Sequence, residues 1–463
     1  MSELAELAGE LQSRLDRKAG EGRVPGAALA VSDGTGMVEA ATGVLNLGTG
    51  VETTTDSVFQ VGSITKVWTS TLVMQLVDEG KVDLDSPLRS YLPGFRIADE
   101  SAGASLTVRQ VLSHVAGFEG DVFTDTGRGD DAIEKYLGVL SGVPQLFRPG
   151  EMFSYNNAGF CVLGRLVEVL RGQPYGAVLR QRLAGPLGLS HLATRAEEAI
   201  LHRAALGHVR PTPEADPSPA PVWSLAPSNE AAGSMLSMSP RDLLGFAAMH
   251  LRGGTAPDGA RILSDKAVRA MQERQVELPF LGMMGNAWGL GWEIFDWEGG
   301  PVIGHDGGTI GQSAFLRIVP EANVSVALLT NGGNPFPMYQ DVFGLALSEL
   351  AGVSVPAHPE PPSVPPPVSD PSRYVGRYEA DVVVIDVSVD DAGQLRSTMT
   401  VRGPLAEAGG ADPEEHDLVL LSGETFLTAD ATEGIHQPLA FLGDDGQGRA
   451  QFVHMGRAVR RAG

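Results

Sequence analysis

Cysteine is almost absent from this sequence, because Cys161 is the single one among 463 residues. One thiol forms no intramolecular disulfide and no cluster of thiolate metal ligands. Cys161 lies in the apolar stretch FCVLGRLVEVL, where a buried cysteine is far more common than a reactive one. The sequence therefore gives no support for a disulfide framework, and we expect Cys161 to be a core residue.

The sequence also lacks long apolar runs and an excess of positive charge. No stretch approaches the roughly 18–20 apolar residues that a membrane span needs. The start, MSELAELAGELQSRLDRKAG, has the pattern of a charged amphipathic helix and lacks the basic, apolar and cleavage regions of a signal peptide. The net charge of −23 repels phosphate backbones and anionic lipid. We therefore expect a cytoplasmic protein with neither nucleic acid nor membrane as a partner.

The composition, 43% hydrophobic and 20% charged, is that of a globular protein with room for two or three domains. Residues 355–372 contain eight prolines and no apolar period, which predicts an interdomain linker. Strand patterns stand at both ends of residues 1–354 with helical patterns between them. This arrangement predicts an α+β domain whose antiparallel sheet is built from both ends. Residues 373–463 read as short strands separated by turns and predict an all-β barrel or sandwich.

The stretch VGSITKVWTS places Ser63 and Lys66 one helical turn apart, at the point where a loop becomes an apolar helix. A helix N-terminus favours negative charge on the serine oxygen, and a nearby amine can take its proton. The simpler interpretation is a serine cap and a solvated lysine. Lysine is scarce, at five in the chain, and the following residues predict a buried helix, so the spacing favours an activated nucleophile.

The stretch PGEMFSYNNAGFCVLG offers two overlapping motifs, Y-x-N from Tyr155 and Asn157 and S-x-N from Ser154 and Asn156. A phenol can relay a proton if cationic neighbours lower its pKa. Asn157 could bind the lysine and a substrate amide. Taken alone, the stretch also fits a loop in which asparagine caps a helix.

The stretch IGHDGGTIG places His305, Asp306 and Gly307 after the apolar start of a strand. Glycines there allow a substrate backbone to approach closely. In isolation, a glycine-rich hairpin with a chance histidine is an equally good interpretation.

Taken together and in order, these stretches resemble the serine β-lactamase and penicillin-binding-protein superfamily, in particular its class C-like branch. The resemblance covers most of residues 10–350 and includes VFQVGSITK, LTVRQVLSHVAGF, PLGLSHLAT, WGLGW and GHDGGTIG. The better-known set S-x-x-K, S-D-N and K-T-G is followed only in its first member. Here Y-x-N and H-x-G stand in the later places, as is common in this branch, and this register selects Tyr155 over Ser154.

The resemblance implies that Ser63 is the acyl-accepting nucleophile and Lys66 its activator. It further implies that Tyr155 is the general acid and base, that Asn157 orients the substrate and that His305 lies beside the cleft. The backbone N–H groups of Ser63 and Gly308 would form the oxyanion hole. No cofactor is implied, and the scattered histidines show no H-E-x-x-H metal motif.

The C-terminal module resembles the lipocalin-like domain of some members, through YVGRYEAD and VHMGRAVRR. Such a domain would cover or border the cleft. Arg457 is then a candidate for binding a substrate carboxylate, although an outward-facing surface arginine is the simpler interpretation. Gly307 and Asp306 are further substrate-binding candidates, the latter for an incoming ammonium group.

The family leaves the acyl acceptor open. The chain looks like penicillin-binding-protein-type thioesterases, which release nonribosomal peptides as rings. In this hypothesis Ser63 takes a peptidyl group from a carrier-protein thioester, and the peptide's own amine closes the macrocycle. The alternatives are a D-stereospecific aminopeptidase or amidase, an esterase for small acyl groups and, less favoured, a β-lactamase or a non-catalytic binding module.

Overall fold

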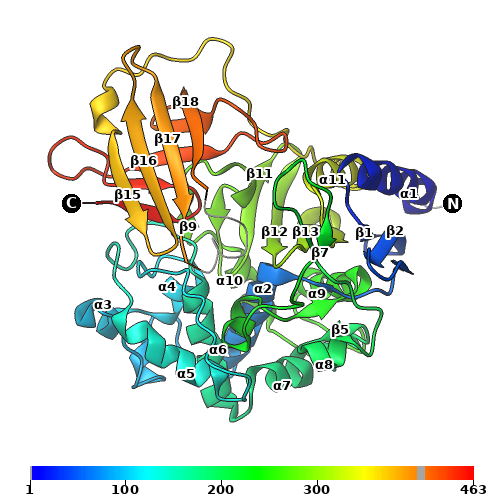
Figure 1. Ribbon diagram of the computed structural model, residues 1–463. Helices are drawn as coiled ribbons and strands as arrows, with labels where there is room; N and C mark the ends of the chain where they lie inside the picture. Colours follow the sequence, from blue (N-terminus) through cyan, green and yellow to red (C-terminus); the bar gives the residue numbers. More distant parts are fainter. Residues whose placement is uncertain (1–2, 404–411, 463) are drawn as a thin grey trace.

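The computed structural model describes residues 3–403 and 412–462. Its first part is a nine-stranded antiparallel sheet with helices on both faces, and its second part is a closed eight-stranded barrel (Figure 1). The predicted α+β domain followed by an all-β module is therefore confirmed, and the module is a barrel and not a sandwich. Residues 1–2, 404–411 and 463 of the predicted domain ranges lie outside the described residues.

The sheet joins strands from both ends of the first domain, in the order β3-β2-β1-β14-β13-β12-β11-β10-β9. Strands β1 and β14 pair from Ala27 opposite Thr330 to Ser32 opposite Ser325. This pairing brings the N-terminal hairpin beside the late strands, as the sequence predicts. The strands are β1 (Gly26–Ser32), β2 (Met37–Asn46), β3 (Val51–Glu52), β9 (Val276–Glu277), β10 (Ala287–Trp288), β11 (Glu293–Trp297), β12 (Gly300–Gly308), β13 (Ser313–Val319) and β14 (Val324–Thr330).

The sheet is buried on both faces, which explains the nearly continuous apolar run in β1. Ala28 and Ala30 face one core, which contains α2 (Thr65–Asp78) and α9 (Pro240–Leu251). Leu29 and Val31 face the other core, with α1 (Glu3–Glu21) and α11 (Phe336–Ala351). The layers are thus helices, sheet, helices (Figure 1).

A helical subdomain packs against α2 on the same side as the first core, mainly through α6. The side chain of Asn156 caps α6 by accepting from the Gly159 N–H, and Gly172 ends the helix in the left-handed conformation. The remaining helices are α3 (Glu100–Ser105), α4 (Val108–Leu112), α5 (Ala132–Val139), α6 (Asn157–Arg171), α7 (Tyr175–Leu179), α8 (Ala196–Ala199) and α10 (Asp265–Gln272). Short strands β4 (Phe59–Gln60), β5 (Leu192–Ala193) and β8 (Ser237–Met238) form a small sheet, and β6 (His208–Val209) pairs with β7 (Ser218–Pro219).

The barrel closes by pairing its first strand with its last. Its interior is filled by aromatic side chains, since the rings of Tyr374, Phe426 and Phe441 lie 4.9–5.5 Å apart. The described part of the barrel therefore has a packed core of apolar side chains. Its strands are β15 (Gly376–Ala380), β16 (Val383–Val389), β17 (Leu395–Val401), β18 (Glu414–Ser422), β19 (Thr425–Thr428), β20 (Pro438–Leu442), β21 (Phe452–His454) and β22 (Ala458–Arg461).

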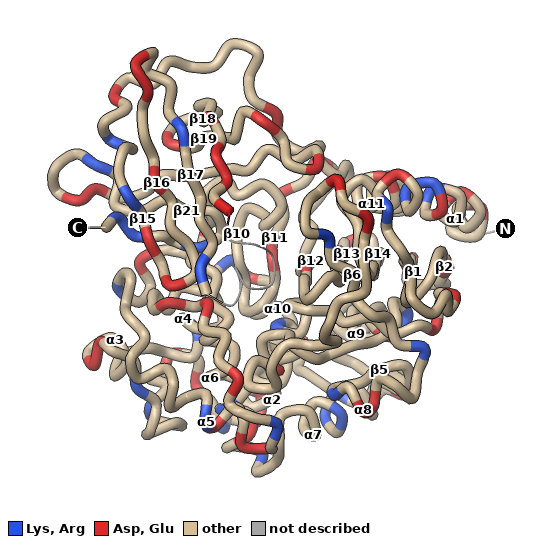
Figure 2. The backbone as a smooth tube through the Cα atoms, viewed as in Figure 1, with Lys and Arg blue, Asp and Glu red and all other residues tan. Residues whose placement is uncertain are grey.

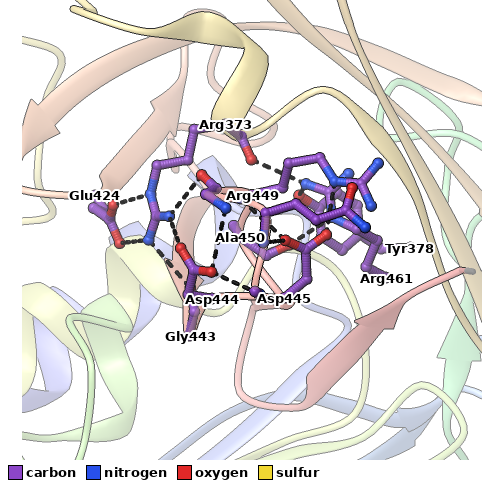
Figure 3. A network of polar contacts seen from close by, with 12 residues as sticks. Arg373, Tyr378, Glu424, Gly443, Asp444, Asp445, Arg449, Ala450 and Arg461 are labelled. Carbon is purple, nitrogen blue, oxygen red and sulfur yellow. Dashed lines mark hydrogen bonds and ion pairs between the residues drawn. The ribbon is translucent and has the colours of Figure 1, made fainter.

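Strand β22 is held by a network of polar contacts around Arg461 (Figure 3). The guanidinium of Arg461 donates to the carbonyl oxygens of Ala450 at 2.6 Å, Val375 at 2.7 Å and Arg373 at 3.0 Å, and to the Tyr378 hydroxyl. These bonds tie the closing strand to the first segments of the barrel.

The turn between β21 and β22 contacts the loop that precedes α6 in the first domain. The Tyr155 N–H donates to the Gly456 carbonyl at 2.9 Å, and the Ala458 N–H donates to Ser154 Oγ at 3.1 Å. His454 Nε2 donates to the Phe153 carbonyl at 2.8 Å. The barrel therefore fixes the segment that leads into Tyr155.

Residues 352–370 connect the two bodies without regular structure. Helix α11 ends at Ala351 and β15 begins at Gly376, while the exact domain boundaries at 354 and 372 stay predictions. Acidic residues are spread over both bodies with basic ones among them (Figure 2). In the described part of the chain, no helix combines the length and the apolarity needed to cross a membrane.

Candidate active site

Ser63 and Lys66 are in direct contact at the start of α2. Lys66 Nζ donates to Ser63 Oγ at 3.0 Å and to the carbonyl oxygen of Ala232 at 2.7 Å. Ser63 lies in a 3₁₀ turn just before α2, and no described side chain caps that helix. The interpretation as a capping serine with a solvated lysine is therefore wrong, and the contact is one through which an amine can activate a hydroxyl group.

Lys66 is completely buried, at 0% exposure. Burial disfavours the ammonium form and lowers the pKa of Lys66 to about 7, and the positive charge of Arg457 acts in the same direction. Near neutral pH a large share of Lys66 is thus a free amine, which can accept the proton of Ser63.

Tyr155 lies next to this pair, and its side chain lines the same cavity as Ser63. Lys66 Nζ and Arg457 Cζ each lie 4.8 Å from the centre of its ring. Burial nevertheless raises the pKa of Tyr155 above its usual value, against the opposing effects of the Ser63 hydroxyl and the charge of Arg457. The phenol therefore stays protonated at neutral pH, which differs from the expectation that cationic neighbours lower its pKa.

Asn157 and Arg457 share one carboxylate that the sequence analysis did not single out. Asn157 Nδ2 donates to Asp121 Oδ1 at 2.6 Å, and Arg457 Nε donates to Asp121 Oδ2 at 2.8 Å. The guanidinium of Arg457 thus points toward the first domain and not outward, although 41% of the side chain remains exposed. The expected contact between Asn157 and Lys66 is replaced by the contact with Asp121.

The other half of the overlapping motif has structural roles. Ser154 Oγ accepts from the Ala458 N–H, and Asn156 caps α6. His114 also stabilises this loop, because its Nδ1 accepts from the Asn156 N–H at 2.8 Å and its carbonyl accepts from the Ser154 N–H at 2.8 Å. The register that begins with Tyr155 is therefore the one that presents side chains to Ser63.

His305 is buried on β12, with 1% exposure. Its Nδ1 lies 2.6 Å from the Asp306 carbonyl oxygen, which can only accept, so Nδ1 carries the proton and Nε2 is an acceptor. Burial and the charge of Lys66 lower the pKa of His305 to about 3, so the ring is neutral. Among the described residues, Nε2 is buried and has no hydrogen-bond partner.

The backbone of Ser63 lies against the end of β12, where glycine is required. A Cβ on Gly307 would lie 2.0 Å from the Val61 carbonyl oxygen and 2.9 Å from the Ser63 nitrogen. A Cβ on Gly308 would meet nothing within 4 Å, so the space beside it is open. Because Gly307 lies against Ser63, the backbone of its neighbour Gly308 also lies near the backbone of Ser63. An oxyanion hole requires two such backbone N–H groups close together.

Asp306 already has a cationic partner. Arg317, at 0% exposure, donates to its two carboxylate oxygens at 2.6 and 2.9 Å. The side chain of Asp306 keeps 26% exposure, and only this exposed part could bind the ammonium group expected from the sequence. Asp306 is therefore primarily the counter-ion of a buried arginine.

A cavity of about 700 Å³ contains these groups. Its walls include two residues that the sequence analysis missed. Glu293 is 3% exposed and Ser234 is 2% exposed. Among the described residues, neither Glu293 Oε2 nor Ser234 Oγ has a hydrogen-bond partner. Burial and the neighbouring charge of Asp306 raise the pKa of Glu293 well above its usual range. The predicted residues on the cavity wall are Ser63, Tyr155, Asn157, His305, Asp306, Gly307, Gly308 and Arg457.

The described residues contain no group of three or more His, Cys, Asp and Glu side chains that could hold a metal ion. A serine hydroxyl, a buried amine, a phenol and nearby backbone N–H groups are the kinds of group that an acyl-transfer site uses. The fold and the arrangement of these groups have the features of the class of active-serine hydrolases.

Comparison with known proteins places the chain in a family. The sequence profile described as Beta-lactamase matches residues 11–351, so the chain belongs to the β-lactamase and penicillin-binding-protein superfamily. Penicillin-binding protein 4 of Amycolatopsis lactamdurans is 44% identical over 372 residues, which covers 80% of this chain and 97% of that protein.

Two solved structures extend the similarity. The crystal structure of SurE matches 99% of this chain and 100% of its own, with a TM-score of 0.78 and 28% identity, and SurE has also been solved with D-Leu. D-amino acid amidase from Ochrobactrum anthropi SV3, complexed with L-phenylalanine amide, covers 71% of this chain and 92% of its own, with a TM-score of 0.60 and 25% identity. The match with SurE thus extends through the barrel, whereas the amidase match does not span the whole chain.

Proposed function

We propose that this protein is a trans-acting thioesterase and cyclase that releases a peptidyl thioester as a macrocycle. The observation that carries the proposal is the contact between Ser63 Oγ and Lys66 Nζ at the wall of a large cavity that the barrel helps to form. The end-to-end similarity to SurE, which has been solved with D-Leu, supports a D-residue at the acyl end.

The first half-reaction is acyl transfer to Ser63. The neutral amine of Lys66 takes the proton of Ser63 as Oγ attacks the thioester carbonyl carbon, and the phenol of Tyr155 lines the same cavity beside them. The N–H groups of Ser63 and Gly308 stabilise the negative oxygen of the tetrahedral intermediate. The carbon–sulfur bond then breaks, and the proton passes from Lys66 to the leaving sulfur, by way of Tyr155.

The second half-reaction removes the acyl group. The free amine of the same peptide attacks the ester carbon, the new C–N bond forms and the bond to Ser63 Oγ breaks. The proton lost by the amine returns to Oγ through Tyr155 and Lys66. The amine belongs to the bound chain, so its effective concentration at the ester is high, and water competes with it for the same carbon. An apolar cavity wall limits the access of water and therefore favours ring closure over hydrolysis.

Asn157 and Arg457 fit the role of substrate positioning. Both are held by Asp121 on the wall of the cavity, which leaves the Asn157 carbonyl oxygen and the rest of the Arg457 guanidinium to meet a substrate. We propose that the substrate arrives on a carrier protein of a nonribosomal peptide synthetase, in the cytoplasm. This partner is tested by comparing two rates of acyl transfer to Ser63. One is the rate from the peptidyl thioester of the isolated carrier domain, and the other is the rate from a small-thiol thioester of the same peptide.

The test of the function is one assay read by mass spectrometry. A linear peptidyl thioester that ends in a D-residue is incubated with the protein and with Ser63→Ala. We expect a macrocycle from the first and no enzymatic product from the second. Exclusive formation of linear acid overturns the cyclase and supports a D-specific hydrolase, which the similarity to D-amino acid amidase favours.

A further inference from the structure

A second chamber of about 390 Å³ borders the catalytic cavity at the end of β12. The two cavities share part of their walls, namely Met283, Met284, Asp306, Gly307 and Gly308. The second chamber therefore lies next to the site that holds Ser63, around the end of β12.

The chamber lies where all three parts of the chain meet. Phe315 and Phe336 come from the sheet and α11, Pro359 from the Pro-rich segment, and Ile435 and Met455 from the barrel. Clefts at such junctions are the usual place for ligands. The Pro-rich segment is thus a wall of a site as well as a connection.

The walls of the chamber are held in place by contacts outside it. The barrel loop that carries Ile435 is tied to the first domain, because Arg210 forms an ion pair with Glu433 and Asn334 Nδ2 donates to the Glu433 carbonyl at 3.0 Å. The ring of His358 packs edge-on against Phe336 at 6.2 Å. The chamber therefore exists before any substrate binds.

The chemistry of the chamber suits an apolar segment with one positive end. Its surface is mostly aliphatic, aromatic and methionine side chains, and methionine adapts to differing apolar shapes. Asp306 is the carboxylate that lines both cavities, and it stands at their junction with 26% of its side chain exposed. Each carboxylate oxygen accepts one hydrogen bond from Arg317 and has capacity for a further donor.

We propose that this chamber binds the amine-bearing end of the peptide, with its first apolar side chains inside and its ammonium group near Asp306. This inference rests on the proposed cyclase function and assigns the place of the acyl acceptor. The ammonium group gives one proton to solvent water and becomes the free amine, which reaches the ester carbon at Ser63 past Gly308, where no Cβ obstructs the path. The second proton, lost as the C–N bond forms, passes to Ser63 Oγ as described above.

The experiment fills the chamber without touching Ser63. Ile435→Trp and Gln437→Trp each place a large ring in the chamber from the barrel side, and Val364→Trp, at a site 83% exposed in the Pro-rich segment, is the matched control. The readouts are the ratio of macrocycle to linear acid and the rate of Ser63 acylation by a short D-aminoacyl thioester.

We expect each filled variant to lower the ratio of macrocycle to linear acid by about tenfold or more, because the effective concentration of the amine at the ester falls. The rate of Ser63 acylation and the thermal stability should stay as in the wild type. An unchanged ratio in both variants, with cyclisation by the wild type, overturns the chamber assignment alone. Slower acylation with an unchanged ratio also overturns it, because the chamber then holds the acyl or thioester arm. Linear acid from the wild type overturns the cyclase function and this inference together.

Discussion

Asp121 and Arg457 form an ion pair across the two domains, although 336 residues separate them in the chain. The same carboxylate accepts from Asn157, so one buried acid aligns a residue of α6 with a residue of the barrel. The candidate substrate-binding wall is therefore assembled only when the barrel is docked.

This shared carboxylate predicts coupling between the two domains in activity. Asp121→Asn and Arg457→Gln should each lower kcat/KM for the peptidyl thioester, and the double variant should lose less than the sum. Groups in one network couple by about 0.5–3 kcal/mol. The control is Arg460→Gln, because that residue is exposed on β22. Additive losses in the cycle would show that the two side chains act independently.

Ser63 should be the site of covalent labelling. Ser63→Ala should abolish the adduct with an acyl-serine probe and lower turnover on the order of 10⁶-fold, the scale seen when a nucleophilic serine is removed. Ser154→Ala should keep the adduct, because its oxygen accepts from the barrel backbone. Intact-protein mass spectrometry reads both, and a labelled Ser63→Ala protein would contradict the assignment.

The lowered pKa of Lys66, about 7, predicts the pH dependence of acylation. The active form is the neutral amine, which forms above the pKa. The acylation rate should therefore rise with pH through about 7 and then level off. Lys66→Arg stays charged and should be inactive at every pH. Lys266→Arg, on the exposed part of α10, serves as the control. A flat profile between pH 6 and pH 8, measured by rapid-mixing acylation, would remove Lys66 as the base.

The raised pKa of Glu293 predicts an effect on stability. The unfolded chain ionises this carboxyl above about pH 4.3, whereas the folded protein keeps it protonated. The folded state therefore loses stability as the pH rises above that value. Glu293→Gln removes this cost, so its melting temperature relative to the wild type should increase between pH 4.5 and pH 7.5. A difference that stays constant over this range would show that Glu293 is ionised in the folded protein.

The network of Figure 3 predicts a local loss of stability in the barrel. Arg461→Met removes the donors to the carbonyl oxygens of Ala450, Val375 and Arg373. Leaving such groups unsatisfied costs about 1–3 kcal/mol. Denaturant unfolding should show a lower midpoint for this variant and an unchanged one for Arg460→Met. If both variants unfold like the wild type, the network does not hold β22.

The parts of the site that were predictable have local signatures. Ser63 and Lys66 share one helix face, Tyr155 and Asn157 precede a capped helix, and the glycines after His305 mark a close backbone approach. Each pattern spans a few residues, so its geometry follows from the chain itself.

Other parts depend on distant contacts and leave no such signature. Asp121 and Glu293 are single acids in short loops or strands, and their roles come from partners brought together by the sheet and the barrel. The protonation of Tyr155 likewise depends on how deeply the assembled core buries it. The fold class was predictable because both sheet ends and the proline-rich segment are visible in the pattern of residues.

The closure of the barrel by β22 has a consequence for biosynthesis. The turn that carries Gly456 and Arg457 completes the pocket beside Tyr155, and it stays in place only after Arg461 has bound the earlier barrel segments. A ribosome must therefore translate almost to residue 461 before a competent catalyst can exist. Nascent chains stalled earlier would carry Ser63 and Lys66 yet lack a formed pocket.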